Sequence, residues 1–206
     1  MVLVKSNRYP RDCRQLALLS GRYRVIQVEP LGFGASGRPH DYPRAGLHEQ
    51  VLAVADREAV GRFVVWGYSQ GGAMAAMVAQ ASPRVAGMIA GGFSPATEPT
   101  AAWSARMERE QRVPAAARAF WQRFARFDWT EELAAMGCPR LLYAGQDDST
   151  RAAGLRRTLA SLTDGGATVV EFDGLDHRTC NDEPAMSARI VPAVAGWLND
   201  RVGSSW

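Results

Sequence analysis

The stretch GYSQGG, residues 67–72, joins two segments of different character. The apolar run RFVVW (62–66) precedes it and predicts a β-strand. The run AMAAMVAQA (73–81) follows it and predicts a helix. Ser69 therefore stands at a turn from a strand into a helix.

Glycines flank this serine at two-residue spacing on both sides. Gly67 and Gly71 would let the strand and the helix approach without side-chain collision. The turn would lift the Ser69 hydroxyl above the carboxyl edge of a sheet. It would also place the backbone N–H of Gln70 at a helix N-terminus, where the helix dipole favours a developing negative charge. The pattern indicates a nucleophile, and the alternative is a serine that only caps a buried helix.

Short apolar runs alternate with helical patterns along the rest of the chain. Strands are predicted at 1–4, 24–28, 63–66, 85–92, 140–145 and 167–172. Helices are predicted at 11–19, 47–60, 72–81, 151–162 and 184–202. This alternation is typical of an α/β three-layer sandwich, with a mostly parallel sheet of about six strands covered by helices. The strands read as continuous apolar runs, which suits a sheet buried on both faces.

Composition excludes several function classes. The chain has 206 residues and a net charge of +3, and its basic residues are arginines apart from Lys5. They are spread along the chain and form no basic stripe, so nucleic-acid binding is not expected. The cysteines, Cys13, Cys138 and Cys180, are odd in number and far apart, which argues against a disulfide framework or a metal site and favours the cytoplasm. No segment has the length of a membrane span or the pattern of a signal peptide, so no membrane partner is expected.

We expect one domain over residues 1–206, with residues 94–130 inserted as a small helical cap. This segment is much longer than a usual crossover and is rich in arginine and aromatic residues. Its phenylalanines could pack an amphipathic helix on the core, or line a pocket, or do both. The predicted substrate contacts are Trp103, Phe120, Trp121 and Phe124, which favour a small, partly apolar substrate.

In GYSQGG and several other segments the chain resembles the α/β-hydrolase superfamily. Besides GYSQGG, the segment RVIQVEPLGFGASGRP (24–39) is similar to the family's strand and glycine-rich loop, with Glu29 where aspartate is usual. The segment FDWTEELAAMGCPRLLYAGQDDS (127–149) is similar to its helix, strand and G-x-x-D turn. The segment DGLDHRT (173–179) is similar to the turn that carries the family's histidine.

A serine nucleophile needs a base, and three histidines are available. His177 follows a predicted strand by a short turn, so it would lie at the same sheet edge as Ser69, and the family's chain order selects the same residue. His40 and His48 lie in a proline-flanked loop and at the start of a helical segment, and are taken as packing or surface residues.

Three aspartates could orient the base. The resemblance to the G-x-x-D pattern selects Asp148, which leaves Asp147 as a turn residue. Asp176 is adjacent to His177 in sequence, and neighbouring side chains usually diverge, so it is rejected.

The N-terminal region departs from the family pattern. The family builds its second oxyanion donor just after an early strand, often in a His-Gly pair, whereas this chain offers Asn7, whose backbone N–H could serve. The family's usual N-terminal antiparallel hairpin is expected to be absent. If the first strand were then a bare edge, pairing with a second chain in a homodimer would cover it.

The resemblance implies a serine hydrolase that cleaves an ester or related acyl bond of a small molecule, with Ser69 as nucleophile, His177 as base, Asp148 as orienting acid and Gln70 and Asn7 as oxyanion donors. No cofactor and no metal are implied. The alternatives are a catalytically weak or silent ligand-binding protein, and a carbon–carbon bond hydrolase or cofactor-free perhydrolase on the same scaffold.

Overall fold

The computed structural model describes residues 1–4, 18–31, 36–37, 46–96 and 128–203. One sheet organises them, with the strand order β2-β1-β3-β4-β5-β6 and every neighbouring pair parallel. The strands are β1 (Val2–Val4), β2 (Ile26–Val28), β3 (Phe63–Tyr68), β4 (Val85–Gly91), β5 (Arg140–Gly145) and β6 (Ala167–Phe172). The prediction of an α/β fold with a parallel sheet is confirmed.

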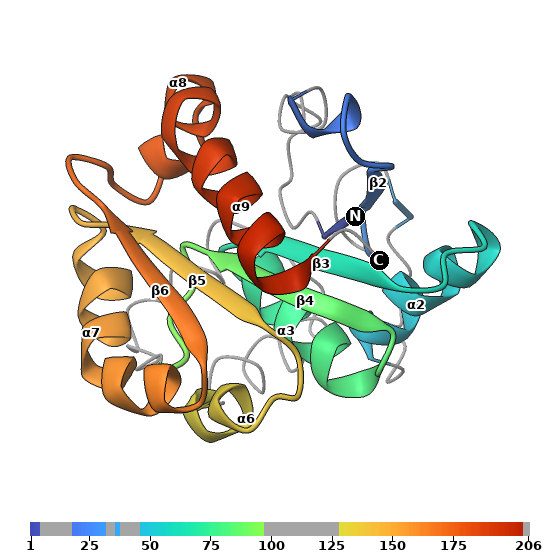
Figure 1. Cartoon of the computed structure of the whole chain (residues 1–206), viewed down its shortest axis with the longest axis horizontal. Helices are drawn as coiled ribbons and strands as arrows, with labels where there is room; N and C mark the ends of the chain where they lie inside the picture. Colours follow the sequence, from blue (N-terminus) through green and yellow to red (C-terminus); the bar gives the residue numbers. More distant parts are fainter. Residues whose placement is uncertain (5–17, 32–35, 38–45, 97–127, 204–206) are drawn as a thin grey trace.

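Helices lie on both faces of this sheet. On one face are α2 (Leu47–Arg57), α3 (Gln70–Ala81), α6 (Thr130–Ala134) and α7 (Ser149–Asp164). Across the other face runs a C-terminal helical segment, residues 183–202 (Figure 1). It consists of α8 (Glu183–Ala185), a π-helical turn η2 (Met186–Ile190), α9 (Val191–Trp197) and a second π-helical turn η3 (Leu198–Val202), and a short 3₁₀ helix η1 (Thr179–Asn181) precedes it.

Alternation along the strands divides the core into two clusters. Successive residues point to opposite faces of a sheet, so Val65 packs with α3 while Val64 packs with the C-terminal helical segment. In β5, Leu142 and Leu141 divide in the same way. Both faces are therefore apolar, which is why the strands read as unbroken hydrophobic runs.

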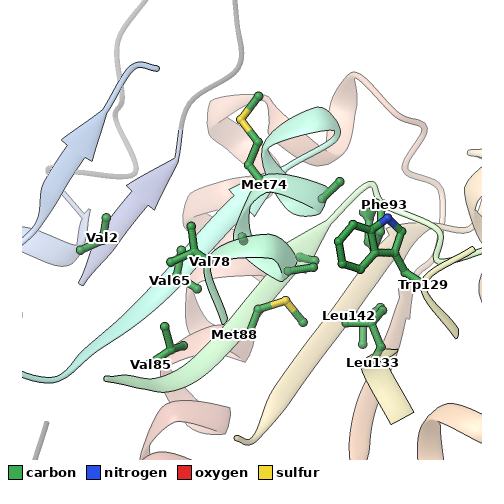
Figure 2. Close-up of a cluster of buried hydrophobic side chains, with 14 of the residues drawn as sticks. Val2, Val65, Met74, Val78, Val85, Met88, Phe93, Trp129, Leu133 and Leu142 are labelled. Atoms are coloured by element: carbon green, nitrogen blue, oxygen red, sulfur yellow. The ribbon is translucent and has the colours of Figure 1, made fainter. Parts of the chain in front are cut away.

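Figure 2 shows the cluster on the α3 side, where Trp129 lies with Phe93 and Leu133. Trp129 is only 5% exposed. This tryptophan lies near the end of the predicted cap segment, residues 94–130, and belongs to the core.

The position of β1 corrects one premise of the sequence analysis. This strand lies between β2 and β3, with Val2 in register with Ile26 on one side and Val65 on the other. It is therefore not a bare edge, because β2 covers it. The homodimer stays a prediction, but the reasoning that led to it was wrong. Among the described residues the sheet holds no antiparallel strand.

Most of the predicted cap, residues 97–127, lies outside the described residues, and so do Trp103, Phe120, Trp121 and Phe124. The two ends of the segment are described and lie together. Ala96 and Asp128 form an isolated antiparallel bridge, and the N–H of Trp129 donates to the carbonyl of Pro95 at 3.0 Å. In the part of the chain that the structure describes, none of the helices is both long enough and apolar enough to cross a membrane.

Candidate active site

Ser69 lies at the end of β3 in a strained backbone conformation. Its φ of 56° and ψ of −118° place it in the left-handed half of conformational space, and among the described non-glycine residues only Ala59 shares a positive φ. Hydrogen bonds hold the turn on both sides: the Ser69 N–H donates to the carbonyl of Gly91 at 2.7 Å, and its own carbonyl accepts from Gly72 at 3.0 Å. Strain of this kind persists only where the surrounding structure enforces it, and it is common at functional sites.

The glycines of GYSQGG make this turn sterically feasible. A Cβ on Gly67 would lie 1.8 Å from the backbone oxygen of Gly71, so the first turn of α3 passes directly over the strand at this point. A Cβ on Gly72 would lie 2.8 Å from Cβ of Phe93. The helix therefore begins in close contact with the sheet, and the predicted role of Gly67 agrees with the geometry.

His177 reaches Ser69 from the turn after β6. Its Nε2 lies 3.0 Å from Oγ of Ser69. The carboxylate of Asp176 shapes this turn, accepting hydrogen bonds from the N–H of Arg178 at 2.9 Å and from the N–H of Thr179 at 2.7 Å. Hydrogen bonds from Thr179 are the main reason that the pKa of Asp176 is lowered. Asp176 thus organises the turn that carries the histidine.

Asp148 completes a chain of hydrogen bonds across three strand ends. Its Oδ2 lies 2.6 Å from Nδ1 of His177, and its Oδ1 accepts from the N–H of Arg151 at 3.4 Å, where it caps α7. The Asp148 side chain is 9% exposed, whereas that of His177 is 42% exposed. Asp147 is an exposed turn residue whose backbone N–H donates to Leu175. The structure therefore brings together Ser69, His177 and Asp148, and it leaves the side chain of Asp147 exposed.

The turn after β5 and the turn after β6 are joined by their backbones, which sequence reasoning did not foresee. The N–H of Gln146 donates to Phe172, and that of Asp147 to Leu175, each at 2.9 Å. A Cβ on Gly145 would lie 2.0 Å from the carbonyl oxygen of Leu175, so only glycine allows this approach. The sequence signal was the glycine at the end of the run RLLYAG.

Tyr68, directly before the serine, was also missed. Its hydroxyl donates to the backbone carbonyl of His177 at 2.6 Å, and the two rings lie 5.3 Å apart. No spacing rule in the sequence distinguishes this tyrosine from an ordinary core aromatic residue.

The other predicted residues divide into described and undescribed ones. Gln70 is the first residue of α3, as predicted, and His48 lies on α2. Asn7 and His40 lie outside the described residues. Among the residues described, no group of histidine, cysteine and carboxylate side chains could hold a metal ion.

The order of the three groups, hydroxyl then imidazole then carboxylate, determines the chemistry that they can perform. An imidazole that faces a hydroxyl through Nε2 and a carboxylate through Nδ1 can accept the hydroxyl proton while the carboxylate stabilises the imidazolium. Bringing the three groups together at one edge requires all three strands to end on the same side, and a parallel sheet provides that.

Several solved structures share this fold. NosK from Streptomyces actuosus is 20% identical, covers 97% of each chain and superposes with a TM-score of 0.74. A thermophilic esterase from Thermogutta terrifontis is 20% identical over 98% of this chain and 90% of its own, with a TM-score of 0.75. E-2-(acetamidomethylene)succinate hydrolase is 20% identical over 97% of this chain and 91% of its own, with a TM-score of 0.79. At these identities the likeness concerns the fold.

Sequence comparison places the chain more specifically. No curated protein matches it significantly. The profile of the alpha/beta hydrolase family matches residues 9–197, which is most of the chain and includes all three residues of the hydrogen-bonded chain. The chain therefore belongs to the alpha/beta hydrolase family.

Proposed function

We propose that this protein is a serine hydrolase that cleaves an ester or related acyl bond of a small, partly apolar molecule through an acyl-enzyme intermediate. The observation that carries the proposal is the continuous chain from Ser69 Oγ through His177 to Asp148, with contacts of 3.0 and 2.6 Å. A serine that only caps a buried helix would need neither a histidine nor a largely buried carboxylate at these distances.

In the first half-reaction, Ser69 Oγ attacks the acyl carbon as His177 Nε2 takes its proton. Asp148 orients the imidazole and stabilises the imidazolium. The carbonyl oxygen of the substrate becomes an oxyanion, which the N–H of Gln70 at the start of α3 would stabilise. In this proposal the second donor is Asn7. When the tetrahedral intermediate collapses, the alcohol leaves with the proton held by His177.

In the second half-reaction, water replaces the alcohol. His177 takes a proton from the water, the hydroxide attacks the acyl carbon, and the second tetrahedral intermediate releases a carboxylic acid and Ser69 with its proton restored. The esterase from Thermogutta terrifontis shares this fold, which supports acyl-bond hydrolysis as the reaction class.

The same proposal includes a single domain with a helical cap over residues 94–130. The bridge between Ala96 and Asp128 supports it, since the segment leaves and rejoins the described fold at one place. In this proposal Trp103, Phe120, Trp121 and Phe124 line the substrate site. A cytoplasmic location is supported by the free thiols of Cys138 and Cys180.

A fluorophosphonate probe and short-chain p-nitrophenyl esters test the proposal. Wild type should be labelled and should hydrolyse the esters, and Ser69→Ala should lose both. Ser94→Ala is the matched control, because Ser94 is buried at 1% exposure and donates to the carbonyl of Ala96. This control should keep labelling. A folded wild type that is neither labelled nor active would contradict the proposal and favour a ligand-binding protein.

Substitutions of Asp148 and Asp147 test which of the two aspartates orients the imidazole. Asp148→Asn should lower kcat by roughly 10³- to 10⁴-fold, because the amide favours the wrong imidazole tautomer. Asp147→Asn changes an exposed side chain and should leave kcat within about twofold. Equal effects of the two substitutions would contradict the assigned role of Asp148.

A further inference from the structure

The turn that carries His177 has to satisfy two distances at once. Nε2 lies 3.0 Å from Ser69 and Nδ1 lies 2.6 Å from Asp148, yet the residue sits outside the regular sheet with its side chain 42% exposed. A small shift of its backbone would lengthen both contacts. The residues that hold this backbone therefore influence the reaction without touching a substrate.

One of these residues is the sequence neighbour of the nucleophile. Tyr68 ends β3, and its hydroxyl donates to the carbonyl of His177 at 2.6 Å. Its ring lies 5.3 Å from the imidazole at an interplanar angle of 42°. Two contacts thus link the nucleophile turn to the histidine turn. The Tyr68 hydroxyl binds the backbone of His177, and the imidazole of His177 binds the Ser69 hydroxyl.

The position of Tyr68 is fixed by the residues around it. Its ring packs beside the ring of Tyr143, with centroids 6.2 Å apart, a ring contact that phenylalanine at position 143 would keep. Gly92 provides the space: a Cβ there would lie 2.6 Å from Cζ of Tyr68, and the φ of Gly92 is +55°. These neighbours leave the phenol little freedom to move away from His177.

The phenol also remains a donor. Burial raises the pKa of Tyr68 above its ordinary value, so the hydroxyl keeps its proton at neutral pH. An ionised phenolate would repel the carbonyl oxygen instead of binding it.

We propose that Tyr68 is a positioning residue, whose hydroxyl holds the main chain of His177 so that the imidazole faces Ser69 and Asp148 together. This inference rests on the proposed function and adds to it a residue outside the three-residue hydrogen-bonded chain. Misplacing a reacting group by a fraction of an ångström slows the chemical step while leaving substrate binding largely intact.

Tyr68→Phe removes only the hydroxyl. Hydrolysis of p-nitrophenyl esters should show kcat reduced by about tenfold with KM within about twofold of wild type. Tyr143→Phe is the matched control, since it also removes a buried hydroxyl of the same aromatic group, is 1% exposed, and bonds Trp66 and not the histidine turn. The control should keep kcat within about twofold. An equal loss in both variants would overturn the proposal and indicate a general packing effect.

The dependence on His177 can be measured directly. In a His177→Ala background, adding Tyr68→Phe should cause no further loss of the residual rate, because the residue through which it acts is gone. The same fold-loss with and without His177 would overturn the proposal.

A readout without turnover separates this inference from the proposed function. In proton NMR, wild type should show a downfield signal for the proton between His177 and Asp148, assigned by its loss in His177→Ala. The signal should broaden and exchange faster with solvent in Tyr68→Phe, and should be unchanged in Tyr143→Phe. An unchanged signal in Tyr68→Phe would overturn the positioning role. A wild type that shows the signal but hydrolyses no ester would contradict the proposed function alone.

Discussion

At the scale of single residues, the site depends on a strained turn at Ser69 that requires glycine at position 67. Ser69 has a backbone conformation that costs on the order of 1–3 kcal/mol for a residue with a side chain. The conformation persists because β3 and α3 are packed and hydrogen bonded on either side of it. The close approach of those two elements is possible only while residue 67 has no Cβ.

Gly67→Ala should therefore destabilise both the fold and the site. The new Cβ would lie 1.8 Å from the Gly71 oxygen, a backbone atom that cannot rotate away. We expect a loss of about 3 kcal/mol or more in the free energy of unfolding, at the upper end of overpacking costs, together with loss of fluorophosphonate labelling. Urea unfolding followed by circular dichroism measures the first quantity.

Gly61→Ala is the control for this substitution. No heavy atom lies within 4 Å of its added Cβ, and its φ is not positive. The free energy of unfolding of this variant should change by about 1 kcal/mol or less. Any change should be an increase, because alanine reduces the conformational freedom of the unfolded chain. A Gly67→Ala protein as stable as Gly61→Ala would contradict the close approach of α3 to β3.

Sequence could supply the three polar residues of the candidate site but not the contacts that hold them. Ser69, Asp148 and His177 follow strand-like runs at recognisable spacings, and a parallel sheet brings strand ends to one edge. Tyr68 acts through a carbonyl 109 positions away, and such a pair depends on strand order, which local patterns do not encode.

At the scale of elements, Arg140 joins α6, β5 and the end of α7. It is only 3% exposed, although arginine side chains are mostly exposed in proteins. Its guanidinium donates to the carbonyls of Met136 at 2.6 Å, of Cys138 at 3.0 Å and of Ala134 at 3.0 Å, and also to that of Gly165. Burial lowers its pKa from the ordinary arginine value. One side chain thus satisfies carbonyls at the ends of two helices.

Arg140→Met should leave those partly buried carbonyls without the donor that Arg140 provides. We expect a loss of about 3 kcal/mol in the free energy of unfolding, because hydrogen bonds to a charged donor contribute about 1.5–3 kcal/mol each and these carbonyls are only partly buried. Arg156→Met is the control: Arg156 pairs with Glu171 but its side chain is 52% exposed, so its loss should be about 1 kcal/mol or less. Similar unfolding midpoints for the two variants would contradict the structural role of Arg140.

At the scale of the whole molecule, alternation of strands and helices was enough to predict the layers. The predicted strands 63–66 and 167–172 fall within β3 and β6. The run 63–66 is unbroken because β3 is buried on both faces and needs no polar position there. The position of β1 inside the sheet was not predicted, since no local pattern distinguishes an edge strand from an interior one. The π-helical turns at 186–190 and 198–202 also left no periodic signal.

Cys180 lies in the core cluster on the side of the C-terminal helical segment, and its thiol gives the stability of the protein a pH dependence. Cys180 is completely buried, next to the turn of His177. Burial, with a smaller contribution from the charge of Asp148, raises the pKa of its thiol from 9.0 to about 11. Well below pH 9 the thiol is protonated in both the folded and the unfolded chain, so it contributes no pH dependence to stability there.

Between these two values the unfolded chain loses the proton more readily than the folded one. Stability should therefore fall as the pH rises from about 9 to about 11, by roughly 2–3 kcal/mol from this group. Cys180→Ala removes the titration, and the cavity it leaves has the same cost at every pH. Urea unfolding of wild type and variant, in reductant from about pH 7 to about pH 11, should show the difference between them shrinking above pH 9. A difference that stays constant across that window would mean that the thiol ionises as readily in the folded protein as in the unfolded chain.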